Sequence, residues 1–408
     1  METVCSSDTC MEVTEQQHVN ERLTETETFA IQIHQFRKAK LPTSGQGVNF
    51  PSARSGHRAI ATDDHMWVLG GYNPDHDAQT NAVRETSLFK ELWKYNITTN
   101  NWVLVPNTEH MPHELASHSA IRHQNHMLVF GGTGFPFGDQ SSNRLTACHL
   151  HSGQWYAVDC KGSKPEKIYG QAMAVIGSNL YVYGGTTGYI YNTELHELNL
   201  HTLNWRKVQP ENMTDELPLE RYRHEIAFDD DHIYVLGGGT SQSVYSLKDI
   251  YVFSIPENVW RLKIAKCDKR LNEYPLPRRC HSCIQLGKNA YICGGYDGEF
   301  IIGDLWRLQL DELQWTKLTD MPEPVYFHSS AITTEGCMIV FGGVSCISPT
   351  TRTNSCYKVW LEIPSLQTIC WQALLHYNPS LLKMSRRQLL NLGLNQAFID
   401  KLPCPEGA

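Results

Sequence analysis

Six apolar segments that each end in a pair of glycines are the most regular feature of the hydrophobic pattern. They read HMWVLGG, HMLVFGG, NLYVYGG, HIYVLGG, NAYICGG and CMIVFGG, and their first glycines are Gly70, Gly131, Gly184, Gly237, Gly294 and Gly342. The spacing between consecutive first glycines is 61, 53, 53, 57 and 48 residues. Because nearly every position before the glycines is apolar, each segment is predicted to be a strand covered on both faces. The glycines permit a sharp turn and close packing where each strand ends.

Tryptophans recur in register with these glycine doublets. Five of them follow a doublet, and each has an apolar residue seven positions earlier: Tyr95 and Trp102, Cys148 and Trp155, Leu198 and Trp205, Phe253 and Trp260, Leu308 and Trp315. This spacing predicts a strand, a turn and an outer strand in each repeat. The sixth doublet lacks the tryptophan, so its repeat is one strand short. The segment from Phe29 to Leu41 alternates apolar and polar residues at its start and could supply that strand, which would close a ring without free sheet edges.

Histidines form a third register. His57, His118, Gln171, His224 and His281 lie 13 residues before the first glycine of a doublet, and His328 lies 14 before. Residues at the same position of separate repeats are spread around a ring, whereas a metal needs three or four ligands at about 2.0 to 2.3 Å from one point. We therefore expect packing and hydrogen bonding between repeats, with no metal and no cofactor.

A repeat period of about 50 residues is typical of kelch propeller blades. The glycine doublets, the tryptophans and the sixfold period resemble the kelch-repeat family. The prediction is an all-β, six-bladed kelch β-propeller over residues 29–363, with a small C-terminal helical extension.

Both ends differ in character from the repeats. Residues 1–28 carry seven acidic residues against one basic residue and few large apolar groups, which predicts a disordered tail. Beyond Pro364 the apolar residues recur at helical spacing, namely at Leu366, Ile369, Cys370, Ala373, Leu374 and Tyr377. Two shorter helices are expected from Ser385 and Asn395, which are good N-cap residues. The extension is assigned to residues 364–402, and a flexible end to residues 403–408.

Bulk composition narrows the classes of partner. A formal charge of −8 and a pI near 6.2 give no general attraction for nucleic acid or an anionic membrane. Neither a signal peptide nor an apolar stretch of membrane-spanning length is present in the sequence. Thirteen cysteines without paired spacing suggest reduced thiols. We expect a cytoplasmic and nuclear protein that binds peptides or proteins.

Short strings within the repeats make the resemblance more specific. They are RSGH (54–57), KIYGQAMA (167–174), GGTTGYIY (184–191), RYRHEIA (221–227), RRCHSC (278–283), PVYFH (324–328) and, in the tail, LLNLGL (389–394). These strings resemble kelch substrate receptors of cullin-2 RING ubiquitin ligases, which capture proteins by their extreme C-termini. The resemblance implies a non-catalytic subunit with Elongin B/C and cullin-2 as partners, and it spans roughly residues 50 to 402.

The tail fits that role by its own pattern. Ser365, Leu366, Cys370 and Leu374 match a BC-box, in which a small residue is followed by Leu, Cys and an aliphatic residue one helical turn apart. Such a stripe can insert into a groove on Elongin C; the alternative is that it caps the propeller. A cullin-binding segment would follow at Leu389, Leu390 and Leu392, although the proline typical of a cullin-2 box is missing from residues 384–394.

The resemblance also implies where a peptide would bind. In kelch receptors the first two residues of the RxxH-like element and the residue after the doublet face the central funnel. Here these are Arg54, Tyr72, Tyr169, Thr186, Arg221, Tyr222, Arg278, Arg279, Tyr296 and Tyr326. Arginine suits a terminal carboxylate because its planar guanidinium donates two parallel hydrogen bonds, and tyrosines give rigid walls. A crowded aromatic cup would favour a terminal glycine or a small residue such as alanine. The alternative is that the arginines pair with acidic residues to tie blades together.

Other functions stay open at this point. Kelch relatives are associated with stress-activated kinase signalling, so a scaffold that binds a signalling kinase or phosphatase, or actin, is the second hypothesis. A copper-dependent kelch oxidase would need a clustered Tyr and His site, which the sequence does not show. The chain's own end, Glu406, Gly407 and Ala408, could enter the funnel of the same or a neighbouring copy.

Overall fold

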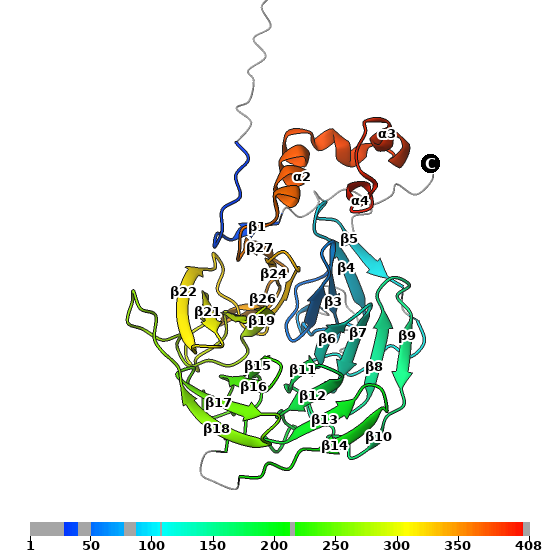
Figure 1. Cartoon of the computed structure of the whole chain (residues 1–408). Helices are drawn as coiled ribbons and strands as arrows, with labels where there is room; N and C mark the ends of the chain where they lie inside the picture. The colour runs from blue at the N-terminus through cyan, green and yellow to red at the C-terminus, as the bar shows by residue number, and fades with distance from the viewer. Residues whose placement is uncertain (1–27, 40–49, 77–86, 107, 213–216, 403–408) are drawn as a thin grey trace, which may run out of the picture.

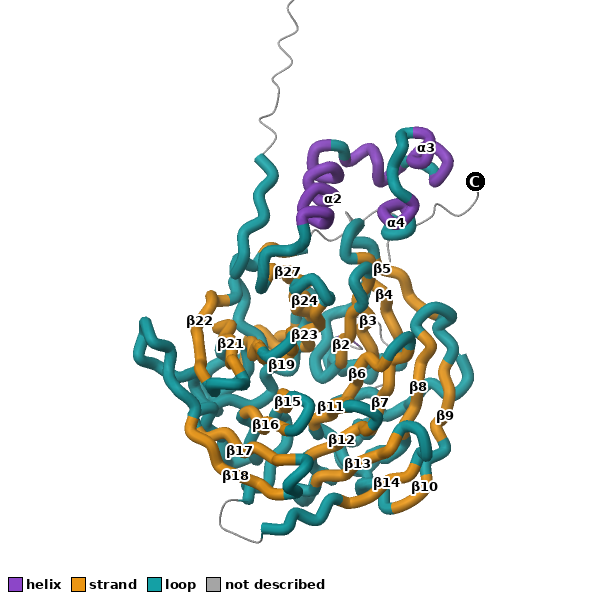
Figure 2. Tube along the Cα trace, in the orientation of Figure 1, coloured by secondary structure: helices purple, strands orange, loops and turns teal. Residues whose placement is uncertain are grey.

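A disc of six sheets around a central axis, with a small helical arm at one edge, makes up the protein (Figures 1 and 2). The computed structural model describes residues 28–39, 50–76, 87–106, 108–212 and 217–402. The predicted acidic tail, apart from residue 28, and the predicted flexible end at residues 403–408 lie outside this part. The all-β, six-bladed propeller predicted from the glycine period is confirmed.

Each blade is an antiparallel sheet whose strands run outward from the axis in chain order. Blade one contains β2 (Arg58–Ala61), β3 (His65–Leu69), β4 (Leu92–Asn96) and β5 (Trp102–Val105). Blade two contains β6 (Ser119–His123), β7 (His126–Phe130), β8 (Leu145–His149) and β9 (Trp155–Val158). Blade three contains β11 (Ala172–Ile176), β12 (Asn179–Tyr183), β13 (Leu195–Asn199) and β14 (Asn204–Lys207), with the short β10 (Lys161–Gly162) parallel to β14.

The second half of the ring repeats this arrangement. Blade four contains β15 (Glu225–Phe228), β16 (His232–Leu236), β17 (Asp249–Ser254) and β18 (Val259–Ile264). Blade five contains β19 (Ser282–Leu286), β20 (Asn289–Cys293), β21 (Asp304–Gln309) and β22 (Gln314–Asp320). Blade six contains β23 (Ser329–Ile332), β24 (Cys337–Phe341) and β27 (Cys356–Trp360). A hairpin, β25 (Val344–Ile347) and β26 (Thr350–Arg352), separates β24 from β27.

The ring is closed by the N-terminal segment. β1 (Arg37–Lys38) pairs antiparallel with β27 and becomes the outer strand of blade six. This is the position predicted for the segment from Phe29, because the sixth repeat lacks its own outer strand. Blade six is therefore built from both ends of the propeller, which leaves no free edge where the first and last blades meet.

The tryptophan register reflects direct cross-strand pairs. Trp102 lies opposite Tyr95 and Trp315 lies opposite Leu308, and the other three pairs follow the same rule. All five indoles are at least 93% buried. Six of the hydrophobic clusters lie between neighbouring blades, so each blade is stabilised mainly by the two beside it.

The glycine doublets mark where one blade meets the next. A Cβ on Gly294 would lie 2.5 Å from the Val325 carbonyl oxygen and 2.6 Å from the His328 ring, both in the next blade. The second glycine of each doublet donates its N–H to a carbonyl of the next blade, as Gly295 does to Val325 at 2.9 Å. His57 hydrogen-bonds the Phe341 carbonyl of blade six at 3.0 Å. The predicted role of the histidine register in packing between blades is thus confirmed.

The helical arm begins directly after Pro364. It contains α2 (Leu366–Tyr377), the 3-10 helix η2 (Pro379–Lys383), α3 (Arg386–Asn391) and α4 (Gln396–Ile399). Ser385 and Asn395 cap α3 and α4 as predicted, Ser365 caps α2, and Ser385 forms a full capping box with Gln388. No helix in the described part of the chain is long and apolar enough to cross a membrane.

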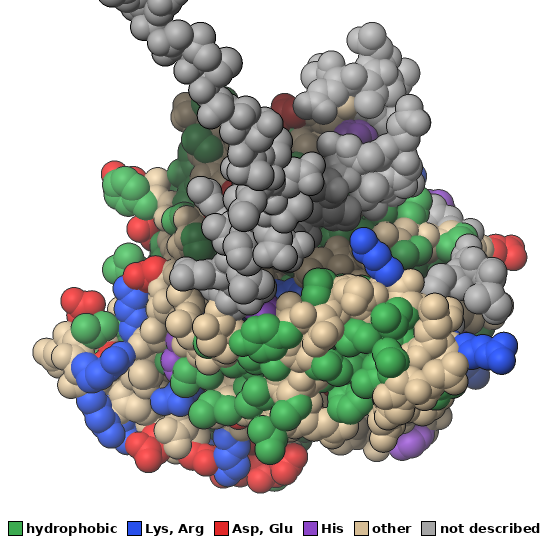
Figure 3. Space-filling view, turned by 90° about the horizontal axis from the view of Figure 1, so that it is seen from above, with side chains coloured by type: hydrophobic (Ala, Val, Ile, Leu, Met, Phe, Trp, Pro, Cys, Tyr) green, Lys and Arg blue, Asp and Glu red, His purple; other side chains and the backbone are tan. Residues whose placement is uncertain are grey.

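Seen from the side that carries the arm, hydrophobic side chains gather over the middle of the propeller surface (Figure 3). Acidic and basic side chains lie mostly along the left and lower margins of that view. The described cysteines, such as Cys280 and Cys356, are free thiols.

Candidate functional site

A closed ring of six backbone hydrogen bonds surrounds the mouth of the central channel. The ring residues occupy the third position of the RxxH-like element in each blade: Gly56, Ser117, Gly170, Arg223, Cys280 and Phe327. Each donates its N–H to the carbonyl of a ring neighbour at 2.7 to 2.9 Å. All six have φ between 56° and 70°, the left-handed region that favours glycine. This conformation lets one residue per blade form the ring.

A cavity of about 280 Å³ lies at this ring and is lined by four of its six residues. In blades one to three the cavity is lined by Gly56, Ser117 and Tyr169, and the ring side chains there are small. On the opposite side the ring contributes Arg223 and Phe327. The cavity is thus bordered by small ring side chains in blades one and two and by large ones in blades four and six.

Four tyrosines from four different blades line this cavity: Tyr72, Tyr169, Tyr222 and Tyr326. All four belong to the set that the sequence places at the funnel. Burial raises the pKa of Tyr222 to about 12 and also raises that of Tyr169 and Tyr326. Their hydroxyl groups therefore stay neutral at physiological pH and can both donate and accept hydrogen bonds.

Two arginines that the sequence analysis does not single out also line the cavity. Arg223 packs against Phe327, with 4.4 Å between its guanidinium carbon and the ring centroid. Arg352, at the end of β26, donates from Nε to the Ser55 hydroxyl at 3.0 Å and lies 5.4 Å from the Tyr72 ring centroid. Within the described part of the chain, Nε of Arg223 and Nη1 of Arg352 are buried and have no hydrogen-bond partner. Burial lowers the pKa of both groups, but a guanidinium remains charged in proteins, so each of these two cavity-lining cations keeps one unpaired donor nitrogen.

The three arginines at the first position of the element do not reach the channel, which corrects their prediction as ligand-binding residues. Arg54, Arg221 and Arg278 are 0%, 2% and 0% exposed. Each donates from Nη1 to the carbonyl of the first glycine in its own blade's doublet at 3.0 to 3.1 Å. Arg54 also pairs with Glu91, and Arg278 with Asp304. These contacts join segments of a single blade. The ion pairs of Arg54 and Arg278 match the alternative that the arginines pair with acidic residues, but they do not bridge neighbouring blades.

The prediction that Thr186 binds the ligand is also corrected. Two other predicted residues, Tyr296 and Arg279, lie beside the cavity. Thr186 is 2% exposed and its hydroxyl donates to the Ile190 carbonyl at 2.8 Å. Tyr296 stacks on Tyr326 with 5.2 Å between ring centroids. Arg279 donates to the Thr240 carbonyl and lies 5.8 Å from the Tyr296 ring centroid. These two residues therefore extend the wall outward from Tyr326.

An ion pair crosses the central axis of the propeller. Arg58 at the start of β2 pairs with Glu225 at the start of β15, with 2.7 Å between Nη1 and Oε1. Arg58 also donates from Nε to the His118 carbonyl at 3.1 Å. Because blades one and four stand opposite each other, this ion pair spans the axis of the propeller. In the described residues, no three His, Cys, Asp or Glu side chains come together as a metal site would require.

The helical arm presents part of the predicted BC-box face to solvent. Leu366 is 74% exposed and Cys370 is also exposed, while the Ser365 hydroxyl caps α2 and contacts Glu335 at 3.0 Å. Leu374 is half-buried against the small core of the arm, which contains Leu381, Leu389 and Ile399.

Leu389 is only 2% exposed, so its prediction as a cullin contact is corrected: the side chain stabilises the arm. Leu390 and Leu392 are 44% and 60% exposed. Both remain on the surface that a partner could meet.

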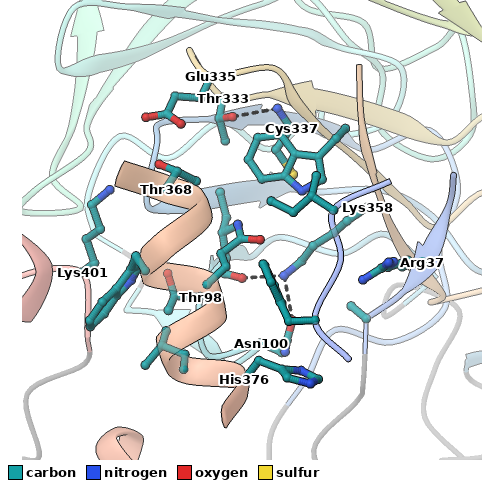
Figure 4. Close-up of a pocket in the computed structure, with 18 of the residues that line it drawn as sticks. Arg37, Thr98, Asn100, Thr333, Glu335, Cys337, Lys358, Thr368, His376 and Lys401 are labelled. Atoms are coloured by element: carbon teal, nitrogen blue, oxygen red, sulfur yellow. Dashed lines mark hydrogen bonds between the residues drawn. The ribbon is translucent and has the colours of Figure 1, made fainter. Parts of the chain in front are cut away.

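The arm is seated on the turns of blades one and six. Between them lies a second cavity of about 490 Å³, in which Lys358 points toward Asn100 and donates to its side-chain oxygen at 2.8 Å (Figure 4). The N-terminal segment reaches the arm through Phe29, whose N–H donates to the Tyr377 hydroxyl at 3.0 Å. Trp371, 4% exposed, stacks on Phe398. The buried side of α2 thus faces the propeller and α4, which leaves Leu366 and Cys370 outward.

Comparison with known proteins agrees with this architecture. The family model described as the KLHDC2/KLHL20/DRC7 Kelch-repeats domain matches residues 16–238 and 194–374. The chain is similar to Kelch domain-containing protein 10 of Homo sapiens, at 49% identity over 86% of this chain and 80% of that protein. It is also similar to that of Xenopus laevis, at 49% over 88% and 87%, and to the Drosophila melanogaster homolog, at 39% over 87% and 62%. The chain therefore belongs to the kelch-repeat family.

Proposed function

We propose that this chain is a substrate-recognition subunit of a cullin-2 RING ubiquitin ligase that binds the free C-termini of proteins in the channel mouth. The observation that carries the proposal is that Arg223 and Arg352, each with one unpaired donor nitrogen among the described residues, line a cavity walled by tyrosines. A buried cationic donor without a partner is costly to maintain. A ligand that brings an anionic oxygen into the cavity would remove that cost.

A terminal carboxylate fits this cavity better than an internal peptide segment does. The Arg58–Glu225 pair crosses the channel axis, and we infer that it stops a chain that has entered the cavity from passing through. Charge-assisted hydrogen bonds from arginine to a carboxylate contribute about 1.5 to 3 kcal/mol each. The volume of about 280 Å³ favours a small last residue such as glycine or alanine.

The arm supplies the second half of the proposed function. Leu366 and Cys370 lie one helical turn apart on the outward side of α2, and both side chains are exposed. Two exposed apolar groups at i and i+4 form the kind of narrow stripe that docks into a groove. In the proposed complex these residues contact Elongin C. Leu390 and Leu392 face the cullin, and the bound protein is ubiquitinated by the assembled ligase.

Co-purification with Elongin B and C tests the ligase role. The Leu366→Ala/Cys370→Ala variant is expected to lose the complex while its unfolding midpoint stays unchanged, because both side chains are exposed. Ile363→Ala, which alters a 74% exposed residue just before the helix, is the matched control and should retain binding. Equal recovery of Elongin C by the unaltered chain and the double variant would contradict the proposal. A propeller that binds peptides but never Elongin would instead fit the scaffold hypothesis.

A further inference from the structure

An exposed hydrophobic ridge lies beside the cavity on blades two and three. It consists of Phe135, Phe137, Tyr189 and Ile190, which are 43%, 45%, 80% and 65% exposed. These residues belong to the loops that follow the glycine doublets of β7 and β12. Phe137 lines the cavity itself, so the ridge starts at the cavity wall and continues outward.

The ridge is held in place by contacts between the two loops. A Cβ on Gly188 would lie 2.7 Å from Cα of Gly138, so the backbones approach as closely as two glycines allow. The Tyr189 hydroxyl donates to Asp139 at 2.8 Å. The ridge is therefore a preformed surface, for which a ligand would lose little entropy in ordering the receptor.

Aromatic contacts continue the ridge into the cavity wall. Phe137 meets Tyr72 edge to face, with 4.9 Å between ring centroids. Phe135 lies 5.7 Å from Phe137 and 6.2 Å from Tyr72, measured in the same way. Successive rings thus lead from the wall of the cavity to its rim.

The corresponding loops on the other side of the mouth have different chemistry. The loop of blade four presents Ser241, Gln242 and Ser243, and that of blade five presents Asp297 and Glu299 beside Phe300. A chain whose carboxylate is bound near Arg223 and Arg352 has to leave the mouth across one of the loops that border it, and these loops differ in what they offer an apolar tail. Carboxylates on the blade-five rim would repel an acidic tail and offer little to an apolar one. The rim of blades two and three exposes four large hydrophobic side chains, and its Asp139 carboxylate accepts a hydrogen bond from Tyr189.

We propose that the residues just upstream of the bound C-terminus lie along this ridge, so that the protein selects tails with apolar side chains at the third to sixth positions from the end. This inference rests on the proposed function. An extended chain advances about 3.3 Å per residue, so four residues cover roughly 13 Å of ridge. The bound tail would then bury aromatic rings that are partly exposed in its absence. This burial stabilises apolar tails more than polar ones.

Two peptides test the inference. Both are ten residues long and end in Ala-Gly; one has Leu at the fourth and sixth positions from the end, and the other has Ser there. The unaltered chain should bind the Leu peptide about tenfold more tightly, as measured by calorimetry. Tyr189→Ser/Ile190→Ser should remove that preference and leave affinity for the Ser peptide unchanged. Phe300→Ser, which alters the 62% exposed residue at the equivalent loop position of blade five, should keep the preference.

The alternatives give separate results. Equal affinity for the two free-acid peptides, or a preference that survives Tyr189→Ser/Ile190→Ser, would overturn the ridge but leave carboxylate recognition intact. An amidated Leu peptide that binds as well as the free acid would overturn the proposed function and, with it, the ridge as an upstream contact. A change of mass in sedimentation for Tyr189→Ser/Ile190→Ser would show that the ridge instead contacts a second copy of the chain.

Discussion

Arg58 of blade one donates a 2.7 Å hydrogen bond to Glu225 of blade four, so one ion pair joins opposite sides of the propeller across its axis. Both side chains are 14% exposed. Glu225→Gln should lower the free energy of unfolding by about 3 kcal/mol, because the positive charge of Arg58 would remain partly buried without its counter-charge. Denaturant midpoints measure this change. Arg58→Met combined with Glu225→Met should recover part of it, whereas a single variant as stable as the unaltered chain would contradict the account.

The glycine doublets give a second stability prediction. Gly294→Ala should be strongly destabilising, because its Cβ would meet the Val325 carbonyl at 2.5 Å and the His328 ring at 2.6 Å. Gly287 in the same blade is the control: its φ is similar, at 55°, but a Cβ there would meet nothing within 4 Å. Gly287→Ala should cost only about 1 kcal/mol, the typical penalty for alanine in a left-handed conformation. Thermal unfolding that shifts equally for both variants would show that close packing between blades is not the cause.

Much of the propeller could be predicted from the sequence because its constraints are local and repeated. The glycines, tryptophans and histidines each recur at fixed offsets, and each offset corresponds to a contact that every blade must make. The same regularity made the prediction for the first-position arginines wrong, because a repeated position can serve packing in every blade instead of ligand binding. Arg54 and Arg278 share their position with Leu115, Ile168 and Val325, all buried between blades. The apolar residues at the equivalent position of other blades indicate that this position is buried between blades and does not face the channel.

Arg223 and Arg352 were harder to predict. Arg223 faces the channel because its backbone is left-handed, at φ 56°. The residue types at the six ring positions differ, so they do not predict this conformation. Arg352 belongs to the β25–β26 hairpin, which has no counterpart in the other repeats. Its position therefore cannot be predicted from the offsets that the repeats share. Likewise, Leu389 and Leu390 are adjacent in sequence, and only the packing of three short helices decides that the first is buried.

Stability should depend on pH through the histidine register. Burial lowers the pKa of His118 and of His328 to about 3, and it also lowers the pKa values of His57, His224 and His281 well below the ordinary value. These rings stay neutral in the folded chain while the unfolded chain binds protons below its ordinary pKa of about 6.5. The unfolded state then carries more protons, so stability falls as pH drops below about 6.5 and is unaffected above it. Each ring contributes up to about 1.4 kcal/mol per pH unit.

Replacing one ring by the residue that blade three uses tests this account. His328→Gln copies Gln171, whose side chain donates to the Phe130 carbonyl at 2.8 Å. Unfolding free energies measured from pH 7 to pH 5 should show a slope shallower by about one proton than in the unaltered chain. An unchanged slope would mean that His328 is already protonated in the folded state.

Peptide titration with a free or an amidated C-terminus tests the central claim most directly. The unaltered chain should bind the free acid at least tenfold more tightly than the amide, because two cationic donors lose their anionic partner in the amide. Arg223→Gln and Arg352→Gln should each reduce that ratio toward one, while Arg206→Gln, an exposed arginine of β14, should preserve it. A ratio near one for the unaltered chain, or an undiminished ratio in both cavity variants, would contradict recognition of C-termini by these arginines.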